Sequence, residues 1–95
     1  MITDLLKFTI KEEAMAEAIE LMKKQMQDNL SDEGCQLAKT FRSKTNTNEI
    51  FMLLGWENQD AISRHLEAEH DQLFRENLDP LLAGAPEFFE WEPIE

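Results

Sequence analysis

The feature of this sequence that most constrains its fold is the run Ile50–Glu57, IFMLLGWE, in which every residue before the final glutamate is apolar or glycine. Such a run is typical of a strand buried on both faces, since a strand with one wet face alternates apolar and polar residues. The chain has 95 residues, enough for one domain, and its helices can cover only one face of a sheet. We therefore expect a second copy to cover the other face, in a homodimer. Phe89 and Trp91 would be core or dimer contacts.

Hydrophobic periodicity predicts the elements that precede this run. Residues Thr3–Ile10 alternate and indicate a first strand, and Cys35–Arg42 indicate a second. The polar segment Ser43–Glu49 is typical of a hairpin connection. Between the first two strands, apolar residues recur every three or four positions and predict an amphipathic helix facing the core: Met15, Ile19, Met22, Met26 and Leu30.

The second half of the chain predicts a helical region and a last strand. Residues Asn58–Gly84 are helical in pattern, with Asn58 as the cap and breaks near Glu69 and before Pro80. The segment Pro86–Ile94 is strand-like. The order is β, α, β, β, α, β, which is the plan called ferredoxin-like. We expect one α+β domain over the whole chain, with an antiparallel four-stranded sheet.

Composition narrows the possible partners. The formal net charge of −11 and the scattered basic residues argue against nucleic acid, because phosphate binding needs clustered Lys and Arg. No apolar run approaches the roughly 18 residues of a membrane span. The N-terminus carries Asp4 and does not resemble a secretory signal, so we expect a cytoplasmic protein. The one cysteine, Cys35, has no partner for a disulfide and fits a reducing compartment.

The residues with the most chemical potential are the two histidines, His65 and His70. On one unbroken helix they would point about 140° apart, but a break between them would change that. His70 shares a helix face with Phe74, so it would lie where an apolar face meets the sheet and could accept a proton near neutral pH. The alternative is a histidine that only hydrogen-bonds a backbone carbonyl. Two histidines and scattered acids make no metal signature, and nothing predicts a cofactor.

The spacing of several residues resembles that of a known family. Trp56 and Glu57 end a strand, His65 follows nine residues after the tryptophan, His70 fourteen after it, and Phe74 four further on. This pattern is similar to that of the antibiotic biosynthesis monooxygenases, which are small dimeric α/β barrels. The segment DEGC, from Asp32 to Cys35, also looks like that family's Glu-x-Gly-Cys entry to the second strand.

The resemblance implies a homodimer with a pocket between sheet and helices in each subunit. It also implies a monooxygenase that oxidises a small quinol or other polyphenolic aromatic with O2 and without metal, flavin or haem. The physical logic is that an electron-rich phenolate can itself reduce O2, so the protein need only deprotonate and shield it. His70 would be the leading catalytic base and His65 the second. The substrate-binding walls would be Trp56, Phe74 and Phe41.

This chain departs from the family pattern at several positions. Many relatives carry a glutamate two residues before the tryptophan, where this chain has Leu54. The haem-degrading branch has an asparagine and a haem-ligating histidine where this chain offers Asp4 and Phe74, so haem degradation is not expected. Two alternatives stay open on the same scaffold. One is a dimeric domain that binds a small ligand or serves in stress without catalysis, and the other is an isomerase of a small signalling metabolite.

Overall fold

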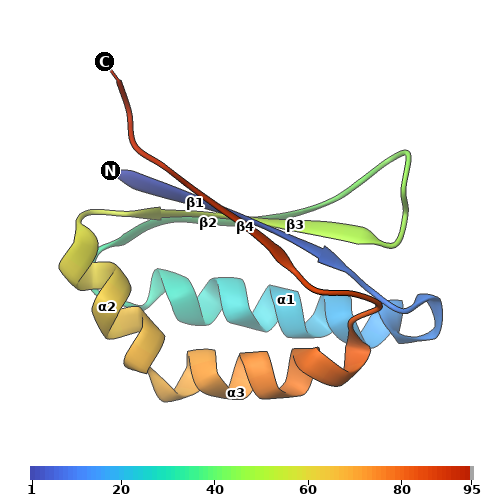
Figure 1. Cartoon of the computed structure of the whole chain (residues 1–95). Helices are drawn as coiled ribbons and strands as arrows, with labels where there is room; N and C mark the ends of the chain where they lie inside the picture. Colours follow the sequence, from blue (N-terminus) through green and yellow to red (C-terminus); the bar gives the residue numbers. More distant parts are fainter. Residues whose placement is uncertain (95) are drawn as a thin grey trace.

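The computed structural model describes residues 1–94, which form a four-stranded sheet covered by helices (Figure 1). All neighbouring strands are antiparallel, and their order is β2-β3-β1-β4. The ferredoxin-like α+β class expected from the sequence is therefore confirmed. The strands are β1 (Ile2–Thr9), β2 (Cys35–Arg42), β3 (Glu49–Trp56) and β4 (Glu87–Trp91).

The three helices lie together on one face of the sheet (Figure 1). They are α1 (Met15–Leu30), α2 (Gln59–Glu67) and α3 (Glu69–Leu78), with short 3-10 turns η1 (Glu12–Ala14) and η2 (Asp79–Leu81). The side chain of Asn58 caps α2 as expected, accepting a hydrogen bond of 3.0 Å from the backbone N–H of Ala61. Within residues 1–94, no helix has the length and apolar character that a membrane crossing requires.

Two predicted element boundaries are displaced by the pairing of the strands. The first strand ends at Thr9, because Ile10 leaves the ladder and forms an isolated bridge with Leu82. The last strand covers only Glu87–Trp91, because β4 pairs with β1 alone and Trp91 already faces Thr3. The hydrophobic period of one segment does not show where its partner strand ends, so these boundaries could not be predicted from it.

The core lies between the sheet and the helices, and β3 supplies much of it. Ile50, Met52, Leu54 and Trp56 point to the helical side and are at most 5% exposed. The intervening Phe51 and Leu53 face the other way and stay half-buried. The apolar run is thus fully covered on one face only within a single chain.

The opposite face of the sheet has no helix over it (Figure 1). It carries large apolar side chains together with the charged group of Lys7, Glu49 and Glu87. In the strand register Phe41 is opposite Phe51, and Phe89 is opposite Leu5. Phe41, Phe89 and Trp91 are 51%, 43% and 49% exposed. Phe89 and Trp91 were expected in the core or at a dimer contact, and the first of these two predictions is wrong. We call this surface the open sheet face.

Gly34 sets the turn that leads from α1 into β2. Its φ of 86° lies in the left-handed region, which glycine adopts without strain. A Cβ on Gly34 would lie 2.5 Å from Cβ of Ala61 in α2, too close for two carbon atoms. The turn therefore packs directly on α2, and the backbone N–H of Glu57 donates to the Gly34 carbonyl at 2.8 Å. Because the turn packs closely on α2, Asp32, two residues before Gly34, lies next to that helix.

We predict that Gly34→Ala lowers the free energy of unfolding by about 2–4 kcal/mol, because it adds backbone strain and a clash with Ala61. The measurement is urea denaturation followed by circular dichroism. Gly84→Ala is the matched control, since a Cβ at Gly84 meets no atom within 4 Å. If the Gly34→Ala and Gly84→Ala variants are equally stable, the prediction is wrong, and the turn adjusts to remove the strain and the clash with Ala61.

Candidate functional site

Two histidines meet at one carboxylate where α2 and α3 join. Ala68 has an extended backbone (φ −67°, ψ 137°), so the predicted break lies between His65 and His70. Nδ1 of His65 is 2.8 Å from Oδ2 of Asp32, and Nε2 of His70 is 2.9 Å from both oxygens of that carboxylate. The two ring centroids are 5.6 Å apart. The break thus brings together two side chains that a continuous helix would separate.

The ring of His65 is enclosed on all sides. Its Nε2 lies 3.1 Å from Oδ1 of Asp71, whose other oxygen lies 3.0 Å from Nε of Arg75. The imidazole packs in a tilted arrangement against the buried indole of Trp56, with centroids 4.6 Å apart. His65 therefore lies between two carboxylates, one at each ring nitrogen.

This environment decides the protonation of His65. Burial, the largest influence, lowers its pKa, but the hydrogen bonds and charges of Asp71 and Asp32 together outweigh it and the pKa is raised. A neutral imidazole would present a lone pair to one of the two carboxylates, whereas the protonated ring donates to both. His65 is thus better suited to hold its neighbours in place than to take a proton from a ligand.

A cavity of about 480 Å³ lies between the sheet and the helices. This volume is in the range of sites for small organic molecules. We call the part of its lining around His65, with Asp4, Asn29 and Asp71, the polar end; the other polar lining residues are Gln59, Arg75, Asp79 and Glu90. Its walls are mostly apolar and include Leu6, Met52, Leu54, Ile62, Phe74 and Phe88. The expected pocket between sheet and helices is present, and it suits a largely apolar ligand with polar groups at one end.

Asp4 is a cavity residue that sequence reasoning did not select, as are Asn29 and Asp71. It lies on the helical side of β1, is 4% exposed, and its Oδ1 has no hydrogen-bond partner. Burial, followed by the charge and hydrogen bonding of Glu90 on β4, raises its pKa to about 6, against the weaker opposing effects of Trp56 and His65. The sequence does contain a signal for this residue: Asp4 is an acid on the same side of the alternating first strand as the apolar Leu6 and Phe8.

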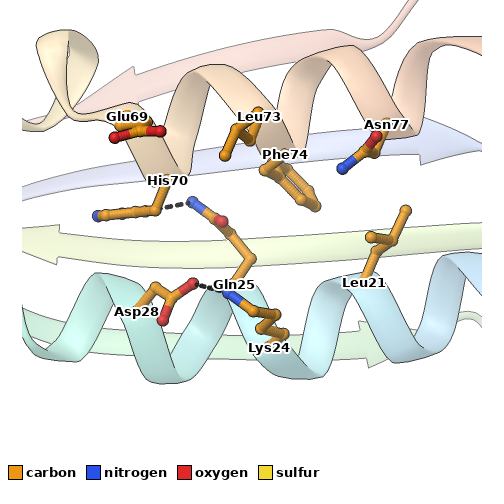
Figure 2. Close-up of a pocket in the computed structure, with 9 residues that line it drawn as sticks. All are labelled: Leu21, Lys24, Gln25, Asp28, Glu69, His70, Leu73, Phe74 and Asn77. Carbon is orange, nitrogen blue, oxygen red and sulfur yellow. Dashed lines mark hydrogen bonds and ion pairs between the residues drawn. The ribbon is translucent and has the colours of Figure 1, made fainter.

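His70 lies on a different surface from the cavity. It faces a cleft of about 500 Å³ between α1 and α3 (Figure 2). There Nδ1 of His70 is 3.3 Å from the side-chain nitrogen of Gln25, which also lies 2.8 Å from Oδ1 of Asn29. Phe74 lines both this cleft and the cavity. Among the described residues, His65 contributes to the cavity wall directly, whereas His70 reaches that wall through Asp32, which pairs with His65, and through Gln25, which contacts Asn29 and Asp71.

The two remaining residues expected as pocket walls lie elsewhere. Trp56 has no exposed surface and lies beneath the His65 ring, so it supports the wall without forming its surface. Phe41 is on the open sheet face at the far edge strand β2. The structure thus brings Phe74 and His65 together at the cavity and leaves Phe41 apart from them.

The chain belongs to the antibiotic biosynthesis monooxygenase family, because the model of that family matches residues 1–83. No curated protein sequence matches this chain.

Solved structures share the fold at low sequence identity. A conserved protein of Methanosarcina mazei is 22% identical, with a TM-score of 0.91 over 96% of this chain and 90% of its own. A crystal structure of an antibiotic biosynthesis monooxygenase is 14% identical, with a TM-score of 0.94 over 100% of both chains. The protein Rv0793 of Mycobacterium tuberculosis is 15% identical, with a TM-score of 0.92 over 99% of this chain and 95% of its own. At these identities the likeness shows the fold.

We predict that Asp4→Asn stabilises the fold above pH 6. Because the pKa of Asp4 is raised from 3.8 to about 6 on folding, its contribution to stability is full below pH 3.8 and is lost as the pH rises through 6. Asparagine keeps the shape without the buried charge, so the variant should gain about 1–2 kcal/mol at pH 8 and little at pH 4. Thermal unfolding at both pH values measures this, and a gain independent of pH would contradict it.

Proposed function

We propose that this protein is a monooxygenase that oxidises a small quinol or polyphenol with O2, and that the reaction takes place in the cavity between sheet and helices. The observation that carries the proposal is a buried carboxyl, Asp4, whose Oδ1 has no hydrogen-bond partner, at the polar end of an apolar cavity in a chain of this family. Oxidation by O2 is proposed from the family, and a small aromatic substrate is proposed from the size and apolar lining of the cavity. A planar aromatic would fill the apolar part and direct a hydroxyl to Asp4.

The protein's chemical task in such a reaction is to remove a proton. A phenolate or enolate transfers electrons to O2 far more readily than the neutral form, so deprotonation starts the oxidation. One oxygen atom of O2 then enters the substrate and the other leaves as water, with all four electrons supplied by the substrate. The apolar walls keep bulk water away from the oxygenated intermediate.

We assign the proton acceptor to Asp4. Its pKa of about 6 leaves it mostly ionised at neutral pH, yet more basic than an ordinary aspartate. Its free Oδ1 is available to a ligand, whereas both nitrogens of His65 already face carboxylates. Asp4 is also the cross-strand neighbour of Leu54, the position where many relatives carry a glutamate. The carboxyl group would thus reach the same part of the pocket from the neighbouring strand.

The two histidines have supporting roles in this proposal. His65 forms part of the cavity wall and holds Asp71 at the polar end. His70 acts through Asp32 and fixes the orientation of that carboxylate and, through it, of His65. His70 as the direct base is the competing assignment, and the two make different predictions.

We predict that Asp4→Asn lowers enzyme-dependent O2 uptake with a panel of quinols and dihydroxyaromatics by about 100-fold or more, as expected for loss of a general base. His70→Ala should lose much less. In the wild type, kcat/KM should rise with pH through about 6, since Asp4 must be ionised. Glu90 and His65 are the charged groups that act on Asp4, and Asp71, Arg75 and Asp79 are the other charged groups that line the cavity. The measurement is oxygen-electrode uptake against the autoxidation rate of each substrate.

The matched control is Asp28→Asn, which removes a carboxylate from the outer cleft and should leave the rate unchanged. Collapse of uptake in His70→Ala but not in Asp4→Asn would place the base at His70. Uptake no faster than autoxidation across the panel, with saturable aromatic binding, would favour the binding domain. Turnover of a ligand equally well without oxygen would favour the isomerase.

We further propose that the open sheet face is the contact of a homodimer. It carries the exposed side chains of Phe41, Phe89 and Trp91, and large apolar side chains exposed on one face are a common mark of an interface. Lys7 on the same face is paired with Glu49 at 3.0 Å and with Glu87 at 3.3 Å, so its charge has partners within the subunit. A second copy would cover the outward side of the apolar run in β3.

We predict that Phe89→Glu converts a dimer into a monomer, because it introduces a charge at the centre of β4 on the open sheet face. Analytical ultracentrifugation measures the mass directly. Leu73→Glu is the control, since Leu73 is similarly exposed, at 48%, but lies at the helical cleft. A monomeric wild type, or a Phe89→Glu variant that stays dimeric, would overturn the interface.

A further inference from the structure

We infer that Asp32, His65 and His70 form a binding site for one divalent transition-metal ion, with Zn²⁺ the best match to the donor set. One ligand atom from each of the three side chains lies within 4.8 Å of the other two. Two imidazole nitrogens and a carboxylate are ligands that zinc accepts in proteins. This site lies behind the His65 ring, apart from the proposed oxidation, and does not depend on it.

The facing atoms are the correct ones for ligation. Nδ1 of His65 and Nε2 of His70 both point at the Asp32 carboxylate, at 2.8 and 2.9 Å. In a tetrahedral zinc site, bonds of about 2.0–2.1 Å place ligand atoms about 3.3 Å apart. The side chains therefore need to separate by about 0.5 Å to admit the ion. His70 and Asp32, at 23% and 20% side-chain exposure, have room for this movement and leave a position for water.

The second nitrogen of His65 already has the partner that a metal ligand needs. That of His70 gains one when the amides of Gln25 and Asn29 are both turned over, since Nε2 of Gln25 now lies 2.8 Å from Oδ1 of Asn29. Metal-binding histidines usually pass their other ring N–H to a carboxylate or carbonyl oxygen, which fixes the ring. Nε2 of His65 is 3.1 Å from the Asp71 carboxylate. Nδ1 of His70 is 3.3 Å from the amide of Gln25, whose oxygen accepts that proton if the amide is turned over. Figure 2 shows Gln25 reaching across from α1 to His70.

A bound ion would take over the role of a protonated His65 ring. Two carboxylates, Asp32 and Asp71, enclose His65; Arg75 pairs with Asp71, and without an ion the second negative charge is balanced by protonation of His65. A divalent ion would satisfy Asp32 and both facing imidazoles without a protonated ring. Because the three ligands come from the α1–β2 turn, α2 and α3, the ion would also fasten these segments at the end of the cavity.

The test is titration of the metal-stripped protein with Zn²⁺ by calorimetry, and with Co²⁺ by visible absorption. We expect one equivalent to bind, a tetrahedral Co²⁺ spectrum, and a higher Tm with Zn²⁺. His70→Ala should weaken Zn²⁺ binding by about 100-fold or more, and Gln25→Ala by about 10-fold through its effect on His70. Circular dichroism establishes that each variant is folded.

Glu69→Gln is the matched control, because it removes a neighbouring acid at the same helix junction without touching a ligand. It should bind Zn²⁺ as the wild type does. Binding of several equivalents, equal binding of Mg²⁺, or unchanged affinity in His70→Ala would show only diffuse attraction of cations to an acidic surface and would overturn the site. If His70→Ala fails to fold, the absence of a tetrahedral Co²⁺ spectrum in the wild type would overturn it equally.

Discussion

The candidate site depends on one carboxylate shared by two histidines. The Asp32 carboxylate contacts both His65 of α2 and His70 of α3, and this is possible because the chain bends at Ala68. The same carboxylate follows α1 and precedes Gly34, whose left-handed backbone and lack of a side chain allow the turn to pack against α2. The hydrogen bonds of Asp32 thus connect all three helices near the start of the second strand. They also fix the position of His65, which forms part of the cavity wall.

Function and stability make opposite demands on the polar end of the cavity. Asp4 is buried without a partner for Oδ1, which costs free energy whenever it is ionised. A protein selected for stability alone would place an amide or an apolar residue there. The same cost raises its pKa toward neutrality, which is the property that a general base requires. Buried groups of this kind are therefore informative about sites in a way that exposed acids are not.

The sequence anticipated the family, the order of elements and the break between the histidines, since hydrophobic period and turn residues are local properties. It misjudged or missed what depends on distant neighbours. Phe41 was expected at the pocket but lies on the open sheet face, because strand register decides which side a residue faces. Asp4 was not selected as a site residue, because its burial comes from helices far away in the chain.

Alone, the sequence determined the class of fold, the alternation that gives β1 an inward face, the continuous apolar run of β3, and the presence of two histidines beside a helix break. These follow from backbone preferences and from the periods of strands and helices. Only the tertiary structure decided that both histidines converge on Asp32, that His65 and not His70 lines the cavity, and that Asp4 lies at its polar end. Each of these facts is a contact between segments remote in sequence, and local patterns carry no information about such distances.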